Sequence, residues 1–265
     1  MAIEAIYEHP EDYDLEVTSR EVQDLRFWRA LLLRERPARV LEIGSGTGRL
    51  SLPLAYMGAT HGFTVTGLEL EPLMIRRAEI HGARERGRLG ETLRYIQGDV
   101  RSVDLPGQYD VILFPYGAAH HLVSIDDQFA AWRNVRRCLS PGGLFALDLE
   151  APDFLSLARA LNGTRIRRDL DVRGQDGRRL ARTVTSHYER LTQLATHAFK
   201  YHVCGPDGGR GRYASDFAMH VYFPREVELL CRGTGFRVEQ VLGSYSWAPF
   251  DNQSEVMITL ARAAA

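Results

Sequence analysis

Cysteine is scarce in this sequence of 265 residues, which contains only three. Cys138, Cys204 and Cys231 are odd in number and widely spaced, so they form neither a disulfide framework nor a paired metal-binding motif. No apolar run approaches the ~20 residues that a membrane helix requires. The opening segment, MAIEAIYEHPEDYDLE, is acidic and lacks the basic and apolar regions of a secretory signal. These absences predict a soluble, cytoplasmic protein without a membrane partner.

An excess of charge of one sign is also absent, since 33 basic and 34 acidic residues give a formal net charge of -1. A surface that binds nucleic acid is net basic, so this balance argues against a nucleic-acid partner. The arginines of residues 165–182 are mixed with Asp169, Asp171 and Asp176, and no aromatic residues that could stack on bases lie between them. We interpret that segment as a solvated pair of strands.

Helix and strand signals alternate from residue 17 to residue 150, which is the pattern of a parallel sheet with crossover helices. The first helix is expected at 21–36, where Leu25, Trp28 and Leu32 share one stripe and Pro37 ends the run. Further helices are expected at 48–57, 72–87, 125–139 and 224–236, and strands at 38–44, 63–70, 93–99, 109–115, 144–150, 237–245 and 254–262.

The pattern changes after about residue 160, where polar, β-leaning runs surround the turn pair Asp176-Gly177. This predicts an antiparallel insertion, which we interpret as a lid or dimerisation element. The predicted fold class is α/β, with a doubly wound, Rossmann-like, mostly parallel seven-stranded sheet and a small antiparallel β insertion after strand five. The expected boundaries are 1–160 for the core with an N-terminal helical segment, 161–223 for the insertion, and 224–265 for the last helix and two strands.

A glycine-rich turn follows the first predicted strand, in Val40-Leu41-Glu42-Ile43-Gly44-Ser45-Gly46-Thr47-Gly48-Arg49. A strand that leads through such a turn into a helix presents backbone N–H groups to a ligand. The dinucleotide fingerprint G-x-G-x-x-G would require a third glycine where Arg49 stands. This departure argues against a nicotinamide-dependent oxidoreductase.

Acidic residues follow the next two strands at the same edge of the predicted sheet. Glu69 ends the second strand, where a carboxylate can accept hydrogen bonds from both hydroxyls of a ribose. Asp99 ends the third strand, where it can accept from an adenine amino group. Glycine loop, Glu69 and Asp99 together predict a nucleoside-binding site.

With these residues in register, the sequence resembles the class I S-adenosylmethionine-dependent methyltransferases, and in particular small-molecule members such as amino-sugar N-methyltransferases. The resemblance covers residues 38–150 closely and extends to both flanks. The matching segments are LEIGSGTGRL (41–50), TGLELEPLMIRRA (66–78), IQGDVRSVDL (96–105), YDVILFPYGAAHHL (109–122) and VRRCLSPGGLFALD (135–148).

The resemblance implies S-adenosylmethionine as the cofactor, with S-adenosylhomocysteine as the product. In that family the glycine loop lies against the methionine moiety and the ribose, the acidic residue at Glu69 binds both ribose hydroxyls, and Asp99 with Val100 frames the adenine. The expected cofactor-binding residues are Glu42, Gly44, Ser45, Gly46, Gly48, Glu69, Leu70, Asp99, Val100 and Pro115.

Two adjacent histidines, His120 and His121, follow the fourth strand at the carboxyl edge of the sheet, where such folds place ligands. A methyl acceptor must lose a proton, and a histidine suits that role near neutral pH. We expect His121 to be the base, and we count His120 with the catalytic residues. A capping or core role for His121 stays the alternative.

Aromatic residues are the other expected parts of the active site. Tyr13 matches a family position that lies over cofactor and substrate, so we count it with the catalytic residues. Pocket walls are expected at Tyr116, Tyr222, Tyr245 and Trp247, with core packing as the ordinary alternative. No metal is expected, because no spacing joins the conceivable ligands His120, His121, His220, Asp148 and Glu150.

The predicted function is methyl transfer from S-adenosylmethionine to nitrogen or oxygen of a small-molecule acceptor, in specialised metabolism. The segment Leu113-Phe114-Pro115-Tyr116 lacks the Asn or Asp with which enzymes that methylate nucleic-acid amino groups hold their target. The alternatives are C-methylation of a small molecule and a non-catalytic cofactor-binding or regulatory protein on the same fold. A homodimer stays open.

Overall fold

The computed structural model describes residues 5–18 and 23–264, and the chain divides into two compact units. The larger, called the core unit below, comprises Gln23–Pro152 and Tyr222–Ala265. The smaller, called the sheet unit, comprises the described parts of Met1–Val22 and Asp153–Val221. The residues before the first core helix are thus grouped with the insertion, whereas the sequence boundaries placed them with the core.

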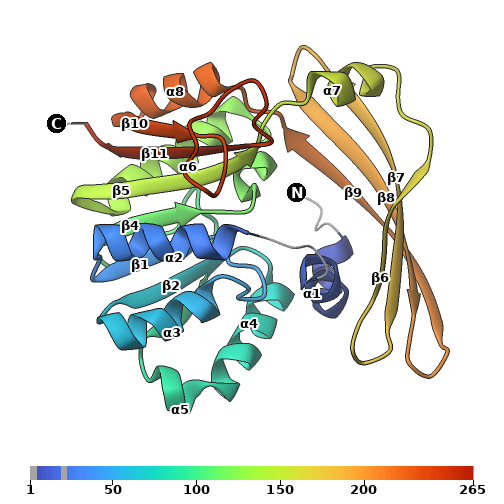
Figure 1. Ribbon diagram of the computed structural model, residues 1–265, viewed down its shortest axis with the longest axis horizontal. Coiled ribbons are helices and arrows are strands. Elements are labelled where there is room, and N and C mark those ends of the chain that lie inside the picture. The colour runs from blue at the N-terminus through green and yellow to red at the C-terminus, as the bar shows by residue number, and fades with distance from the viewer. Residues whose placement is uncertain (1–4, 19–22, 265) are drawn as a thin grey trace. The chain divides into compact units, whose positions relative to one another are not determined.

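The core unit is built on a seven-stranded sheet in the order β10-β11-β5-β4-β1-β2-β3 (Figure 1). Its strands are β1 Arg39–Ile43, β2 Thr64–Glu69, β3 Leu93–Gln97, β4 Tyr109–Phe114, β5 Leu139–Glu150, β10 Phe236–Leu242 and β11 Val256–Ala263. The pairs among β1 to β5 are parallel, and β11 runs antiparallel to both of its neighbours. The predicted Rossmann-like sheet is therefore confirmed.

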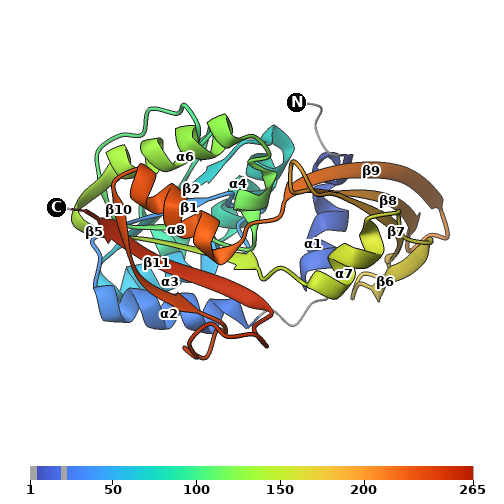
Figure 2. The ribbon, with the colours of Figure 1, turned by 90° about the horizontal axis from the view of Figure 1, so that it is seen from above.

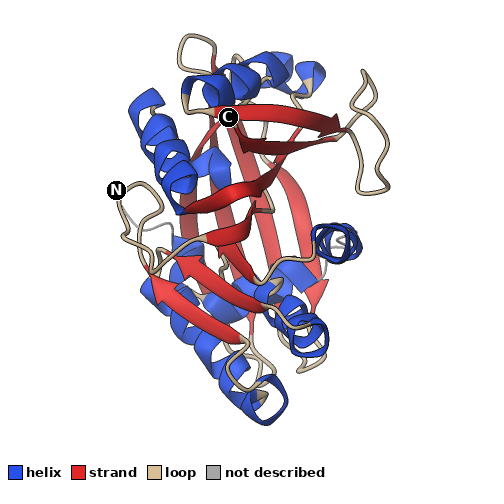
Figure 3. Ribbon diagram, turned by 90° about the vertical axis from the view of Figure 1, so that its left-hand side faces the viewer, coloured by secondary structure: helices blue, strands red, loops and turns tan. Residues whose placement is uncertain are grey.

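Helices cover both faces of this sheet (Figures 2 and 3). They are α2 Asp24–Glu35, α3 Ser51–His61, α4 Pro72–Arg84, α5 Arg86–Leu89, α6 Ile125–Cys138 and α8 Pro224–Gly233, with the short 3-10 helix η2 at Ala118–His121. On one face Phe27, Trp28, Leu31 and Leu32 of α2 pack against the sheet. The alternation of strands buried from both sides with amphipathic helices explains the near-continuous apolar runs in the sequence.

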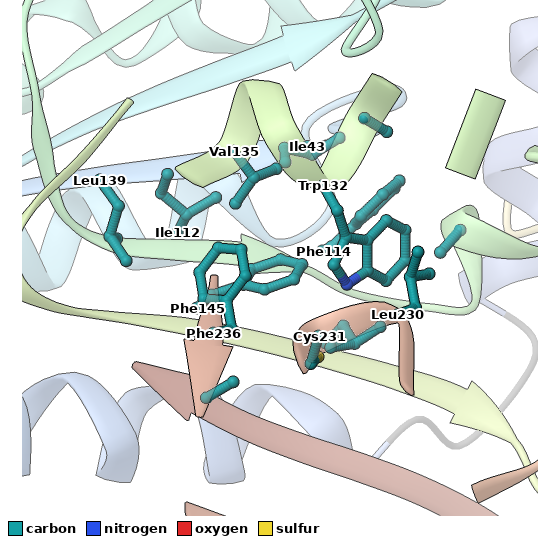
Figure 4. Close-up of a cluster of buried hydrophobic side chains, with 14 of the residues drawn as sticks. Ile43, Ile112, Phe114, Trp132, Val135, Leu139, Phe145, Leu230, Cys231 and Phe236 are labelled. Carbon is teal, nitrogen blue, oxygen red and sulfur yellow. The ribbon is translucent and has the colours of Figure 1, made fainter. Parts of the chain in front are cut away.

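The other face carries the larger aromatic cluster (Figure 4). Trp132 of α6 lies edge-on to Phe145 of β5, with ring centroids 5.7 Å apart, and Phe145 lies 5.3 Å from Phe236 of β10. The side chain of Ser124 caps α6 by accepting a hydrogen bond from the N–H of Asp127. This cap fixes where α6 begins. The helix that follows places Trp132 in the core.

The sheet unit is a four-stranded antiparallel meander in the order β6-β7-β8-β9. Its strands are β6 Arg167–Arg173, β7 Arg179–Glu189, β8 Leu194–Cys204 and β9 Arg210–His220, accompanied by η1 Ala5–Glu8, α1 Pro10–Thr18 and α7 Phe154–Ala160. Gly177 adopts a φ of 86° between β6 and β7, so the predicted turn at Asp176-Gly177 is confirmed.

Buried ion pairs attach α1 to this meander. Arg182 of β7 is 6% exposed and lies 2.6 Å from Glu16 of α1 and 2.6 Å from Asp169 of β6. The hydroxyl of Tyr201 on β8 also donates to Glu16. A charge as buried as that of Arg182 is tolerated because two carboxylates compensate it.

Several element boundaries differ from those expected. Helix α3 begins at Ser51 rather than at residue 48, because Gly48 has a φ of 88° that no helix accepts. Strand β5 begins at Leu139, where a stop was expected over residues 140–143. The pairing with β4 slips there, from Tyr109 opposite Leu139 to Val111 opposite Leu144, which accommodates the extra residues. Residues 21–22 of the first expected helix lie outside the described part.

Among the described residues, no helix is long and apolar enough to cross a membrane.

The buried pair between Glu16 and Arg182 gives a first prediction. Replacing Glu16 with Gln leaves the buried guanidinium with one carboxylate, so we expect the free energy of unfolding to fall by about 3 kcal/mol. The control is Glu228→Gln, because its partner Arg232 is exposed and such pairs contribute ~0–1 kcal/mol. Urea unfolding of both variants measures the difference. Equal small losses would contradict the assigned role of the Glu16 pair.

Candidate functional site

The glycine loop, residues 44–48, connects β1 to α3 at the carboxyl edge of the core sheet. The N–H groups of Gly44 and Ser45 donate to the carbonyl oxygen of Leu68 on β2, at 2.8 and 3.0 Å. Gly44, Gly46 and Gly48 have φ values of 69°, 56° and 88°. A Cβ on Gly48 would come within 2.4 Å of the Tyr95 hydroxyl. Glycine is therefore required by conformation and by space.

Glu69, the last residue of β2, faces this loop. It is 8% exposed, and its carboxylate accepts from the N–H of Gly46 at 2.7 Å and from that of Glu71 at 2.9 Å. Burial raises the pKa of Glu69, while hydrogen bonds from backbone N–H groups and the charge of His121 oppose this shift. Each carboxylate oxygen carries two lone pairs, so both can still accept from hydroxyl groups.

Glu42 of β1 lies beneath the loop and is 3% exposed. Burial raises its pKa to about 8, although the hydroxyl of Ser51, which donates to its Oε2, acts in the opposite direction. Glu42 is accordingly protonated at neutral pH in the folded protein. Its contribution to the site is a neutral hydrogen-bonding group.

Asp99 lies two residues beyond the end of β3, and its carboxylate is paired. The Nε of Arg101 donates to it at 2.9 Å, and the same guanidinium lies 2.8 Å from Asp127. The hydrogen bond from Arg101 lowers the pKa of Asp99. This pairing was not expected from the sequence, although the spacing of an Asp and an Arg two residues apart could have indicated it. The neighbouring Val100 is half-buried against the aromatic cluster.

The turn after β4 carries the next group of predicted residues. Pro115 is buried, and Tyr116 adopts a φ of 58°. The N–H of Tyr116 donates to Oδ1 of Asp148 at 2.6 Å. Burial raises the pKa of Asp148 to about 6, while the Tyr245 hydroxyl, which donates to Oδ2, opposes the shift.

The two histidines of this turn differ in their surroundings. His120 is 5% exposed, and its Nε2 accepts a hydrogen bond from the N–H of Glu150 at 3.1 Å. His121, the last residue of η2, is half-buried. His121 lies close enough to Glu69 for its charge to lower the pKa of that carboxyl group.

The remaining aromatic candidates lie in different parts of the structure. Tyr245 joins the group at the carboxyl edge through Asp148. Trp247 packs on α2, with its ring 4.6 Å from that of Phe27. Tyr222 is 0% exposed and donates to the carbonyl oxygen of Ala119 at 3.1 Å, a placement that favours packing. Tyr13 belongs to α1 of the sheet unit, where its ring lies 6.0 Å from that of Tyr7.

Two further residues at this edge were not expected from the sequence. Asp24, at the start of α2, is 0% exposed. Its two carboxylate oxygens accept hydrogen bonds from the two terminal nitrogens of Arg49, at 2.9 and 2.6 Å. The guanidinium of Arg49 lies 4.7 Å from the ring centroid of Tyr116. The only signal in the sequence was that Arg49 replaces the third glycine of a dinucleotide loop.

The residues of the edge fit a nucleoside cofactor. A Cβ on Gly67 would come within 2.6 Å of the Tyr95 ring and 2.8 Å of the Ser45 hydroxyl, so glycine is what lets these groups pack against β2. The buried Ser45 hydroxyl has no hydrogen-bond partner among the described residues, which leaves it able to bond to a ligand. Leu70, beside Glu69, is 43% exposed and offers an apolar surface. Glu69, Ser45 and Leu70 would hold the ribose and base of S-adenosylmethionine, which supplies a methyl group on a positively charged sulfur. Within residues 5–18 and 23–264, no three His, Cys, Asp or Glu side chains are grouped to hold a metal ion.

Comparison with known families identifies the central segment. Residues 40–143 match a family described as "Methyltransferase domain". The putative methyltransferase YqeM of Bacillus subtilis is 26% identical over 125 residues, which is 47% of this chain and 47% of the relative. The chain spans half or less of the length of the curated relatives it matches.

Solved structures of similar fold cover nearly the whole chain. The CcbJ methyltransferase from Streptomyces caelestis has a TM-score of 0.74 at 24% identity and covers 92% of this chain and 91% of its own. CalS10 from Micromonospora echinaspora, described as an amino pentose methyltransferase with S-adenosylmethionine bound, has a TM-score of 0.68 at 22% identity and covers 94% and 95%. The predicted resemblance is confirmed: residues 40–143 match a methyltransferase domain, and the chain has the fold of S-adenosylmethionine-dependent methyltransferases.

The burial of Glu42 makes a prediction about pH. Its pKa is raised in the folded state, so the folded protein binds the proton more tightly than the unfolded chain between pH 4.5 and about 8. The contribution of Glu42 to stability is therefore complete at low pH and is lost as the pH rises through this window, with a slope approaching ~1.4 kcal/mol per pH unit near pH 6.

Urea unfolding from pH 5 to 8.5 tests this expectation. Glu42→Gln should flatten the decline relative to the wild type, since glutamine does not titrate. Glu91→Gln, at an exposed position, is the control and should keep the wild-type decline. A profile of Glu42→Gln parallel to that of the wild type would exclude Glu42 as the titrating group.

Proposed function

We propose that this chain transfers a methyl group from S-adenosylmethionine to a nitrogen or oxygen atom of a small-molecule acceptor. The observation that carries the proposal is Glu69, a buried carboxylate at the end of β2 that accepts the N–H of Gly46 in the glycine loop at 2.7 Å. The match of residues 40–143 to a methyltransferase domain supports it. The amino pentose named in the description of CalS10 supports an amine as one class of acceptor to test.

The protein's part in such a reaction is mainly to position the reacting groups and accept a proton. We assign His121 as the group that accepts the proton of the acceptor. As the acceptor atom would bond to the methyl carbon and the carbon–sulfur bond would break, the proton of the N–H or O–H group would pass to the imidazole of His121. His120 is the weaker candidate, because its Nε2 already accepts the N–H of Glu150. Tyr116 and Tyr245 would line the acceptor site from the core unit, and Trp247 would help to enclose it.

Glu69 provides the test of the cofactor site. Glu69→Ala should weaken binding of S-adenosylhomocysteine by about 1.5–3 kcal/mol, the contribution of hydrogen bonds to a charged group. Isothermal calorimetry on folded protein measures the dissociation constant. Glu79→Ala, at an exposed position of α4, is the control and should bind like the wild type. Wild-type protein that binds no S-adenosylhomocysteine would contradict the proposed function, and unchanged affinity of Glu69→Ala would remove Glu69 from the site.

His121 provides the test of the chemistry. A panel of amines, amino sugars, phenols and carbon nucleophiles first identifies an acceptor by transfer of labelled methyl. His121→Ala should then lower kcat about 100-fold, the lower end of general-base effects. His61→Ala, at an exposed position of α3, serves as the control. Wild-type turnover by His121→Ala across the pH range would exclude His121 as the base.

A further inference from the structure

The turn after β4 contains a backbone conformation that aromatic residues rarely adopt. Tyr116 has a φ of 58°, in the left-handed region that costs a residue with a Cβ about 1–2 kcal/mol. Gly117 follows with a φ of 65°, and η2 with His121 begins directly after it. The direction of the segment that carries His121 therefore depends on Tyr116 staying in this conformation.

The side chain of Asp148, on the neighbouring strand β5, stabilises this conformation of Tyr116. Oδ1 of Asp148, which is 3% exposed on β5, accepts the N–H of Tyr116 at 2.6 Å. The backbone carbonyl oxygen of Asp148 accepts the N–H of Gly117 at 3.2 Å. Asp148 thus fixes two successive peptide groups of the turn. The hydroxyl of Tyr245 donates to the other carboxylate oxygen, which sets the orientation of the carboxylate.

A second contact acts on the ring of Tyr116 rather than on its backbone. The guanidinium of Arg49 lies 4.7 Å from the ring centroid and is itself held by both oxygens of Asp24. This contact restrains the side chain but does not change the cost of a positive φ. The N–H groups of Tyr116 and Gly117 lie before and after the N–Cα bond of Tyr116, so their two hydrogen bonds to Asp148 together hold its φ.

The turn also lies against the glycine loop. A Cβ on Gly44 would come within 2.8 Å of the Cβ of Ala118, two residues after Tyr116. A change of φ at Tyr116 would move Ala118 and His121 relative to Gly44. The position of the proposed base relative to the proposed cofactor site is therefore set at residue 116.

We infer that Asp148, oriented by Tyr245, is a positioning residue that holds Tyr116 in the left-handed conformation and thereby aims His121 at the reacting centre. The inference rests on the proposed function for the role of His121. The coupling between Asp148 and the φ of Tyr116 is a property of the fold and can be measured without turnover.

The experiment is a set of double-mutant cycles. Asp148→Ala and Tyr245→Phe are each introduced into three backgrounds: wild type, Tyr116→Gly and Tyr116→Ala. Glycine adopts a positive φ without cost and alanine does not, while both lack the aromatic ring. Comparing the Tyr116→Gly and Tyr116→Ala backgrounds therefore separates the effect of the backbone conformation at residue 116 from the effect of losing the contact between the Tyr116 ring and Arg49.

The first readout is the midpoint of urea unfolding. The shift caused by Asp148→Ala should be at least halved in the Tyr116→Gly background and should remain large in the Tyr116→Ala background. Tyr245→Phe should likewise shift the midpoint less in the Tyr116→Gly background than in the Tyr116→Ala background, with smaller shifts throughout. This variant tests the inference if Asp148→Ala does not fold. Equal shifts in all three backgrounds would overturn the inference, whatever the protein catalyses.

The second readout separates positioning from binding. With an identified acceptor, Tyr245→Phe should lower kcat at least fivefold and change the dissociation constant of S-adenosylhomocysteine less than twofold. A loss confined to cofactor affinity would overturn the positioning role. If the wild type binds no S-adenosylhomocysteine, the proposed function fails, and the unfolding cycles still decide whether Asp148 controls Tyr116.

Discussion

Burial of carboxyl groups at one edge of a parallel sheet is the constraint on which this structure depends. Glu42, Glu69 and Asp148 come from β1, β2 and β5, and each is less than one-tenth exposed. Water cannot compensate their charges there, so each needs hydrogen bonds or a proton. Glu69 receives two backbone N–H groups, Asp148 receives one together with a tyrosine hydroxyl, and Glu42 is held protonated beside Ser51. The glycine loop supplies the N–H of Gly46, the residues after β2 supply that of Glu71, and the turn after β4 supplies that of Tyr116.

In the sheet unit, carboxylates that are buried or partly buried are compensated by arginine side chains. Asp12, Glu16 and Asp169 are each paired with an arginine at 2.6–2.8 Å. Full pairing stabilises the attachment of α1 to the meander. At the core edge Asp24 and Asp99 are likewise paired with arginines, whereas Glu42, Glu69 and Asp148 accept hydrogen bonds from neutral groups. Carboxyl groups left without a cation at a sheet edge cost stability, and proteins keep such groups where a ligand uses them. This contrast supports locating the cofactor site on the core unit.

The strands, the glycine loop and the acidic residue at the end of β2 could be predicted because each depends on local sequence. Apolar runs define the strands, and the order of parallel strands brings Gly46 and Glu69 to the same edge. The slip of β5 against β4 and the attachment of α1 to β7 could not be predicted in the same way. Each of these depends on side chains or registers that the tertiary structure selects. The positive φ of Tyr116 has no signature in the sequence, because the hydrogen bond that compensates it comes from Asp148, 32 residues further along the chain.

The adjacent histidines show how local geometry decides chemistry between equivalent residues. In a 3-10 helix, successive side chains point about a third of a turn apart, so His120 and His121 of η2 cannot share surroundings. His120 turns inward, where its ring lies 5.8 Å from that of Tyr222 and its Nε2 accepts the N–H of Glu150. His120 cannot take a proton at that nitrogen without breaking its hydrogen bond to β5. The bond to Glu150 therefore makes His120 a structural support for η2 and favours its neighbour His121 as the proposed base.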